Sequence, residues 1–219
     1  MFRPKLEVLP PAQRALWDRL SFVPRDFVLY GGTAMALRLG HRQSVDFDFF
    51  RDKSFQAEAL MLSMKLPRET RVDRRGESTL SVVIDDVRIS FFGDVGMSRI
   101  YDPEPAENAV NVAALLDLAA TKLKTIQQRA EAKDYQDLAA ALGTGIKLEE
   151  ALAAAGAVFG RRFNAIATLK ALMYFEDGDL QALPAIVKDG LRTAASAIDI
   201  DSLPSLTGTS GVIAQHGLP

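Results

Sequence analysis

Two aspartates, Asp46 and Asp48, are the residues of this chain that most directly suggest chemistry. They are separated by one residue, and side chains two apart in a β-strand leave the same face about 6.6 Å from each other. Carboxylates so placed repel each other unless water or a cation lies between them, and such hard oxygen ligands suit Mg²⁺ or Mn²⁺. The pair therefore indicates a metal site for phosphoryl transfer. Alone, it is more often part of an ordinary solvent-facing strand.

A glycine pair upstream of the aspartates adds a candidate phosphate site. Gly31 and Gly32 follow the apolar run 27–30 and precede the helix-forming residues 33–39, so they predict a tight turn between a strand and a helix. Such a turn lets phosphate oxygens approach backbone N–H groups, and the helix N-terminus and the Thr33 hydroxyl add donors. Most glycine pairs are simply turns. The inference depends on the order of strand, glycine turn, helix and aspartate strand.

A second set of charged residues lies on predicted helices in the C-terminal half. Helical spacing places Lys122 and Arg129 on one side, where both can reach a triphosphate. Lysine would act there as a point charge and arginine as a planar fork on phosphate oxygens. Asp134 and Asp137 share the face of a following helix. From the residues alone, these charges are more typical of a solvated amphipathic helix.

The elements that must position these residues form a mixed front half and a helical back half. Strands are expected over 27–30, 45–50, 68–73, 79–84, 87–92 and near 110–112. Helices are expected over about 10–20, 33–39, 54–64, 114–129 and 133–142, and in several stretches between 148 and 200. The layout predicts an α+β domain over 1–112, a helical domain over 113–201 and a loose, flexible tail over 202–219.

Alternation along two of these strands predicts which side chains face the site. In 45–50, Val45, Phe47 and Phe49 are expected to enter the core, which leaves the two aspartates on the opposite face. In 87–92, Ser90 is expected on the same face as Arg88 and Phe92.

Composition limits the class of protein. The chain has 219 residues, a formal net charge of −2 and no cysteine, which excludes disulfides, thiolate metal sites and cysteine nucleophiles. No apolar run approaches the roughly 20 residues that span a bilayer, and no secretory signal follows residues 1–5. We therefore expect a cytoplasmic protein without a membrane partner. The net charge argues against coating nucleic acid by bulk charge, but four arginines form a local basic cluster: Arg68, Arg71, Arg74 and Arg75.

The segment from Gly31 to Phe50, GGTAMALRLGHRQSVDFDFF, resembles the motif of the AbiEii/AbiGii toxin family. That family belongs to the nucleotidyltransferases with a DNA-polymerase-β-like fold. Segments 118–129 and 133–138 resemble the family's other two motifs, and the resemblance covers residues 25 to 140. It implies a small mixed sheet with helices, followed by a helical C-terminal domain. It also implies a nucleoside triphosphate substrate bound with Mg²⁺ or Mn²⁺.

The resemblance also implies roles for individual residues. Asp46 and Asp48 would hold the metal and take part in catalysis, and three residues would cradle phosphate: Gly31, Gly32 and Thr33. Further contacts to the nucleotide would come from Lys122, Arg129 and Arg42. Asp134 would help to activate the acceptor hydroxyl, and Asp137 would pair with a nearby basic residue and hold the motif in place.

By the same resemblance, the protein would move a nucleoside monophosphate onto an acceptor, with RNA and particularly a tRNA end as a candidate. It would be the toxin of a toxin–antitoxin or phage-defence pair, with a cognate antitoxin. The chain departs from many polymerase-β-like transferases at Ser90, where they carry a third carboxylate. This leaves two alternatives open: a degenerate nucleotide-binding or protein-interaction module, and a phosphotransferase that acts on a protein or small molecule.

Overall fold

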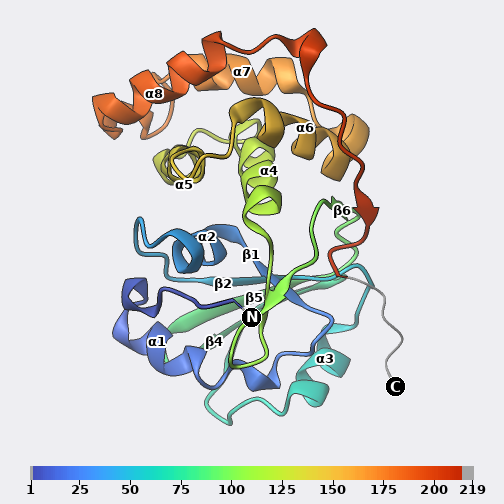
Figure 1. The fold of residues 1–219 in the computed structure, drawn as a ribbon. Coiled ribbons are helices and arrows are strands. Elements are labelled where there is room, and N and C mark those ends of the chain that lie inside the picture. The colour runs from blue at the N-terminus through green and yellow to red at the C-terminus, as the bar shows by residue number, and fades with distance from the viewer. Residues whose placement is uncertain (1, 214–219) are drawn as a thin grey trace. The chain divides into compact units, whose positions relative to one another are not determined.

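The structure is a computed structural model that describes residues 2–213 (Figure 1). The chain divides into two compact units. The sheet unit comprises Met1–Met97, Asp102–Ala114 and Ser210–Pro219, and the helical unit comprises Ser98–Tyr101 and Leu115–Thr209. We describe each unit by itself.

The sheet unit is built on a mixed sheet with the strand order β3-β4-β5-β2-β1-β8-β7. Its strands are β1 (Val28–Tyr30), β2 (Phe47–Phe50), β3 (Arg71–Gly76), β4 (Thr79–Ile84), β5 (Val87–Phe92), β7 (Glu104–Pro105) and β8 (Asn111–Val112). Strand β2 runs parallel to β5 and β1 runs parallel to β8, whereas the other neighbours are antiparallel. A second, two-stranded sheet pairs β6 (Ser98–Arg99) with β9 (Thr209–Ser210). The predicted α+β class is confirmed.

Three helices flank the larger sheet: α1 (Pro11–Trp17), α2 (Gly31–Leu39) and α3 (Ala57–Met64). Figure 1 shows α2 on one face, and α1 and α3 on the other. Aromatic side chains pack against one another in the core of this unit. Phe49 stacks on Phe91 with ring centroids 5.5 Å apart, and Phe27 meets Phe91 edge-on at 5.2 Å. The three rings are buried. This packing fixes the strands that carry the candidate site.

The aspartate strand is shorter than predicted. Phe47 and Phe49 are fully buried as expected, but β2 begins at Phe47, and Val45 is 60% exposed. The prediction that Val45 enters the core was therefore wrong. The pairing of β1 with β2 starts at Tyr30 and Asp48, so the residues before Phe47 have no partner strand to bury them.

The helical unit contains α4 (Leu115–Ile126), α5 (Ala132–Leu142), α6 (Leu148–Phe159), α7 (Ala165–Met173) and α8 (Ala185–Ser196). Helix α4 is central, because it packs against α5, α6 and α7. The buried Asp117 carboxylate ties the segment Ser98–Tyr101 to α4, since it accepts hydrogen bonds from the backbone N–H groups of Ile100 (2.7 Å) and Tyr101 (3.1 Å). Along the described chain, no helix has the length and apolarity needed to cross a membrane.

Residues 202–213 follow the last helix and carry local structure, whereas 214–219, the rest of the predicted tail, lie outside the described residues. Strand β9 lies in this stretch. Further on, Val212 is buried, and its backbone N–H donates to Asp52 Oδ1 at 2.8 Å.

Candidate active site

The glycine turn has a backbone and surroundings that exclude larger residues. Gly31 has φ +73°, and a Cβ at this position would lie 2.6 Å from Asp48 Oδ2. A Cβ on Gly32 would lie 2.7 Å from Arg42 Nη2 and 2.9 Å from Ser44 Oγ. The turn is therefore a cradle with the Asp48 carboxylate against one glycine and a guanidinium and a hydroxyl against the other. Backbone at such a turn is open to close approach by an anion.

A hydrogen bond ties the start of helix α2 to the residues before β2. The Thr33 hydroxyl is 1% exposed and donates to the backbone carbonyl of Asp46. It also accepts a hydrogen bond of 3.3 Å from Gln13 Nε2 on α1. Thr33 thus fixes the position of Asp46 relative to the glycine turn. In this structure the hydroxyl proton of Thr33 is used by the bond to Asp46. The predicted role of Thr33 as a phosphate donor stays a prediction.

The two aspartates differ in environment. Asp46 lies just before β2 and is exposed, whereas Asp48 lies within the strand and is half-buried. Asp48 pairs in register with Tyr30 of β1 and Ser90 of β5. An exposed carboxylate and a sheltered one thus lie two residues apart in the sequence, at the start of β2.

The strand β5 places Ser90 beside Asp48. The hydroxyl of Ser90 lies 3.1 Å from that of Ser81 on β4, so two serines extend the row across the sheet. Among the described residues, no group of three or more acidic, histidine or cysteine side chains is placed to hold a metal ion. Asp46 and Asp48 instead fit an ion of the Mg²⁺ type, which is commonly held by one or two carboxylates while water and substrate phosphates supply the other ligands.

Arg42 lies at the edge of the cradle. Its Nη1 donates to the backbone carbonyl of Gln43 at 2.7 Å, which holds the guanidinium near Gly32. A guanidinium beside a glycine turn can form paired hydrogen bonds to phosphate oxygens. The structure therefore brings five of the predicted site residues together with Arg42: Gly31, Gly32, Thr33, Asp46 and Asp48.

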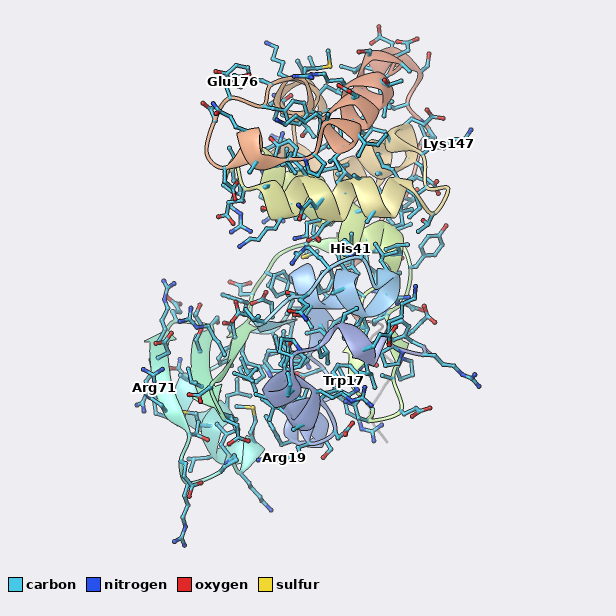
Figure 2. All side chains as sticks on the ribbon, turned by 90° about the vertical axis from the view of Figure 1, so that its left-hand side faces the viewer. Trp17, Arg19, His41, Arg71, Lys147 and Glu176 are labelled. Atoms are coloured by element: carbon cyan, nitrogen blue, oxygen red, sulfur yellow. The ribbon has the colours of Figure 1, made fainter. Side chains whose placement is uncertain are left out.

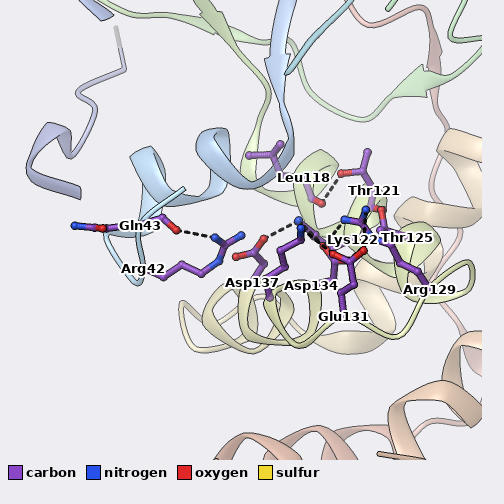
Figure 3. A network of polar contacts seen from close by, with 11 residues as sticks. Arg42, Gln43, Leu118, Thr121, Lys122, Thr125, Arg129, Glu131, Asp134 and Asp137 are labelled. Atoms are coloured by element: carbon purple, nitrogen blue, oxygen red, sulfur yellow. Dashed lines mark hydrogen bonds and ion pairs between the residues drawn. The ribbon is translucent and has the colours of Figure 1, made fainter. Parts of the chain in front are cut away.

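In the helical unit, Lys122 of α4 forms a buried ion-pair network with α5 (Figure 3). Its Nζ lies 2.8 Å from Asp134 Oδ1 and 2.7 Å from Asp137 Oδ2, and both carboxylates are fully buried. Arg129 Nε donates to Asp134 Oδ2 at 2.8 Å, and its Nη1 lies 3.4 Å from Glu131. The prediction that Asp137 pairs with a nearby basic residue is confirmed.

The network keeps Asp134 ionised. Burial raises the pKa of this carboxyl, but hydrogen bonds from Arg129 and Lys122 and the charges of both outweigh it, so the pKa is lowered from 3.8. A carboxylate with a lowered pKa and no exposed surface is a weak proton acceptor. These features favour Asp134 as a group that positions Lys122 and Arg129. Its predicted part in activating the acceptor stays a prediction.

A comparison with known protein families matches a stretch of the chain that contains both sets of residues. Residues 14–204 match the family described as nucleotidyl transferase AbiEii toxin of type IV toxin–antitoxin systems. The chain belongs to this family. The AbiEii match includes the glycine turn, the aspartate strand and the Lys122 network, so it confirms the family that the motifs resemble.

Two individual proteins are similar to this AbiEii chain, one in sequence and one in structure. An uncharacterized protein of Aquifex aeolicus (strain VF5) is 34% identical over 116 residues, which are 52% of this chain and 56% of that protein. The chain thus spans about half the length of this curated relative. The solved structure of MenT4, a nucleotidyltransferase toxin from Mycobacterium tuberculosis H37Rv, aligns with a TM-score of 0.54 at 18% identity, covering 85% of this chain and 84% of that one. The second match supports the fold.

Three residues of this AbiEii protein that shape the two sets were not found by sequence reasoning. Gln13 supports Thr33, Ser44 lies against Gly32, and Asp117 anchors the segment before α4. Gln13 and Asp117 are buried polar residues on helices, a pattern that can mark them once a helical face is assigned. Ser44 has no such signal, because its position depends on how the loop folds over the turn.

Proposed function

We propose that this AbiEii protein is a metal-dependent nucleotidyltransferase that moves a nucleoside monophosphate from a triphosphate to an acceptor and releases pyrophosphate. The observation that carries the proposal is the approach of the Asp48 carboxylate to Gly31, which joins a metal ligand to a phosphate cradle. Residues in this arrangement act by positioning and by stabilising charge, without a covalent intermediate.

In the proposed reaction, Asp46 and Asp48 hold Mg²⁺ or Mn²⁺, which neutralises charge on the triphosphate and on the leaving pyrophosphate. Gly31 and Gly32 offer backbone N–H groups to the phosphates, and Arg42 adds a guanidinium contact. Thr33 acts by holding Asp46 in place.

The residues of the helical unit have a supporting part in this proposal. Lys122 and Arg129 supply positive charge for phosphate, as the family resemblance implies. Of the two, Arg129 is better suited to a direct contact, because its side chain is 45% exposed and that of Lys122 only 7%. Asp134 holds both cations in position and contributes to acceptor activation only through them.

The acceptor proposed here is RNA, with the end of a tRNA as the first candidate, and the protein is proposed to act in the cytoplasm as the toxin of a pair that includes an antitoxin. Membership of a type IV toxin–antitoxin family supports this part of the proposal. The MenT4 fold agrees with it.

A transfer assay tests the proposal directly. The protein is incubated with Mg²⁺, total RNA and each of the four nucleoside triphosphates labelled at the α-phosphate. We expect label in RNA, and Asp46→Asn and Asp48→Asn should each lower the rate at least about 100-fold, the loss typical when a charge-stabilising group is removed. Asp86→Asn is the matched control, since Asp86 lies in the hairpin after β4 with φ +63°, which asparagine tolerates.

The second candidate function is nucleotide binding without transfer, favoured by Ser90 at the place of a third carboxylate. Metal-dependent binding of a triphosphate with no label in any acceptor would overturn the transferase proposal in favour of this one. Label in protein or in small molecules, with none in RNA, would instead show nucleotidyl transfer to a different acceptor, whereas transfer of label only from triphosphate labelled at the γ-phosphate would identify a phosphotransferase.

A further inference from the structure

A row of paired residues leads from Asp48 to the edge of the sheet. In register, Asp48 of β2 pairs with Ser90 of β5, Ser90 with Ser81 of β4, and Ser81 with Arg74 of β3. Residues paired directly across strands point to the same face. With about 4.8 Å between strands, the row spans roughly 14 Å from the metal-binding carboxylate to the outermost strand.

The two neighbouring rows on this face carry further groups of the same kind. On one side, Arg71 and Arg88 both pair with Val83 and therefore share its face. On the other side, Phe50 pairs with Phe92, with ring centroids 5.4 Å apart, and both rings are partly exposed. On the face that carries Asp48, this strip thus consists of exposed arginines and partly exposed aromatic rings on either side of Ser90 and Ser81, which are buried and whose hydroxyls are hydrogen-bonded to each other at 3.1 Å.

The arginines of this face are accessible. Arg71 and Arg74 are exposed on the edge strand, and Figure 2 shows Arg71 at the outer end of the sheet. Arg88 is half exposed and is paired with Asp73 at 3.1 Å, so Arg71 and Arg74 are the better anion contacts. Arg75 points to the other face, where it meets Glu58 of α3 at 3.2 Å.

We infer that this strip is the path of the acceptor: a single-stranded stretch of RNA lies across β5, β4 and β3, with its reacting end toward Asp48. Guanidinium forks at Arg71 and Arg74 bind its phosphates. The rings of Phe50 and Phe92 offer a stacking surface for a base. The inference rests on the proposed function, because Asp48 marks the reacting end.

Binding is measured without transfer, so that it can be tested even if the transferase proposal fails. Fluorescence anisotropy follows a labelled single-stranded RNA oligonucleotide over a series of salt concentrations, with wild type and Arg71→Glu/Arg74→Glu. We expect the double variant to bind at least about tenfold more weakly, and the slope of log affinity against log salt to fall by about 1.4, for two lost phosphate contacts. Its affinity for nucleoside triphosphate should match that of wild type.

The matched control is Arg75→Glu, which makes the same charge change on the same strand but on the other face. Equal weakening by Arg75→Glu and Arg74→Glu would show a general charge effect and overturn the inference. Unchanged RNA binding by the double variant would also overturn it. Displacement of the RNA by poly-glutamate at equal charge would overturn the assignment to nucleic acid. If the wild-type protein transfers nothing but the double variant still loses RNA binding, the strip remains assigned to RNA and only the transferase proposal is rejected.

Discussion

The hydroxyl of Thr33 donates a hydrogen bond to the backbone carbonyl of Asp46, so the first turn of α2 is joined to the aspartate segment directly. Gln13 of α1 completes the junction by donating to the same hydroxyl. Three separate segments of the sequence therefore fix the backbone of Asp46, a proposed metal ligand. The glycine turn and Asp46 cannot shift independently while this junction is intact.

Replacing Thr33 should show how much this junction contributes to stability and how much to activity. Thr33→Val keeps the shape but removes both hydrogen bonds of the Thr33 hydroxyl, so that the Asp46 carbonyl and the Gln13 amide keep only their 3.5 Å contact with each other, which should cost about 1–3 kcal/mol of unfolding free energy. It should also lower the transfer rate, because Asp46 loses its anchor. Thr33→Ser keeps the hydroxyl and should retain most of the activity. Urea unfolding and the RNA transfer assay measure the two effects, and equal activity of the valine and serine variants would contradict the anchoring role.

Gly31 should tolerate no side chain. Gly31→Ala must place a Cβ against Asp48 Oδ2 in a backbone with φ +73°, so we expect both lower stability, by about 1–2 kcal/mol, and loss of triphosphate binding. Isothermal titration with triphosphate and Mg²⁺ measures the binding. The control is Gly156→Ala in α6, where a Cβ meets open space, and this change should stabilise the protein by about 0.5–1 kcal/mol. Normal triphosphate binding by Gly31→Ala would exclude Gly31 from the cradle.

The parts of the site that depend on local pattern could be predicted from the sequence. The apolar run before Gly31 and the alternation around Asp48 identify a strand, a turn and a second strand without knowledge of the packing. Alternation in 87–92 likewise placed Ser90 on one face with Arg88, whereas its pairing with Asp48 is seen only in the sheet register. Strand β3 was expected over 68–73 but forms over Arg71–Gly76. Its residues are mostly charged, so no apolar pattern marks its ends.

The parts that depend on packing between distant segments could not be predicted. Helical spacing placed Lys122 and Arg129 on one side of the helix expected over 114–129, but α4 ends at Ile126, before Arg129, and the sequence does not tell how α5 packs against it. This packing buries Asp134 and Asp137 against Lys122, which becomes the centre of an ion-pair network, and the contact of Lys122 with phosphate stays a prediction. The contact of Gln13 with Thr33 was missed for the same reason.

Lys122 should be essential for the stability of the helical unit. Lys122→Met leaves two buried carboxylates without their shared cation, and breaking a buried ion pair in this way costs about 3–5 kcal/mol. Adding Asp137→Asn removes one of the two carboxylate charges that Lys122 no longer neutralises, and this should recover part of the lost unfolding free energy. Hydrogen exchange of the α4 and α5 amides reports the unit directly. A Lys122→Met protein with wild-type exchange rates that only fails to bind triphosphate would show that Lys122 serves the nucleotide and not the fold.

The pKa shifts of two buried carboxyls predict opposite effects of pH on the helical unit. The pKa of Asp134 is lowered, so its contribution to stability is present above pH 3.8 and is lost as the pH falls through its folded value. The pKa of Asp117 is raised by burial, in spite of hydrogen bonds from Ile100 and Tyr101, so its contribution is greatest below pH 3.8 and declines as the pH rises through its folded value.

The Asp134 effect can be isolated by substitution, since Asp134→Asn cannot titrate. Relative to wild type, this variant should be least stable near neutral pH, and the difference should shrink steadily as the pH is lowered below 3.8. Urea unfolding at a series of pH values, followed by exchange of the α5 amides, measures this difference. A difference that stays constant with pH would mean that Asp134 is not held ionised by Arg129 and Lys122.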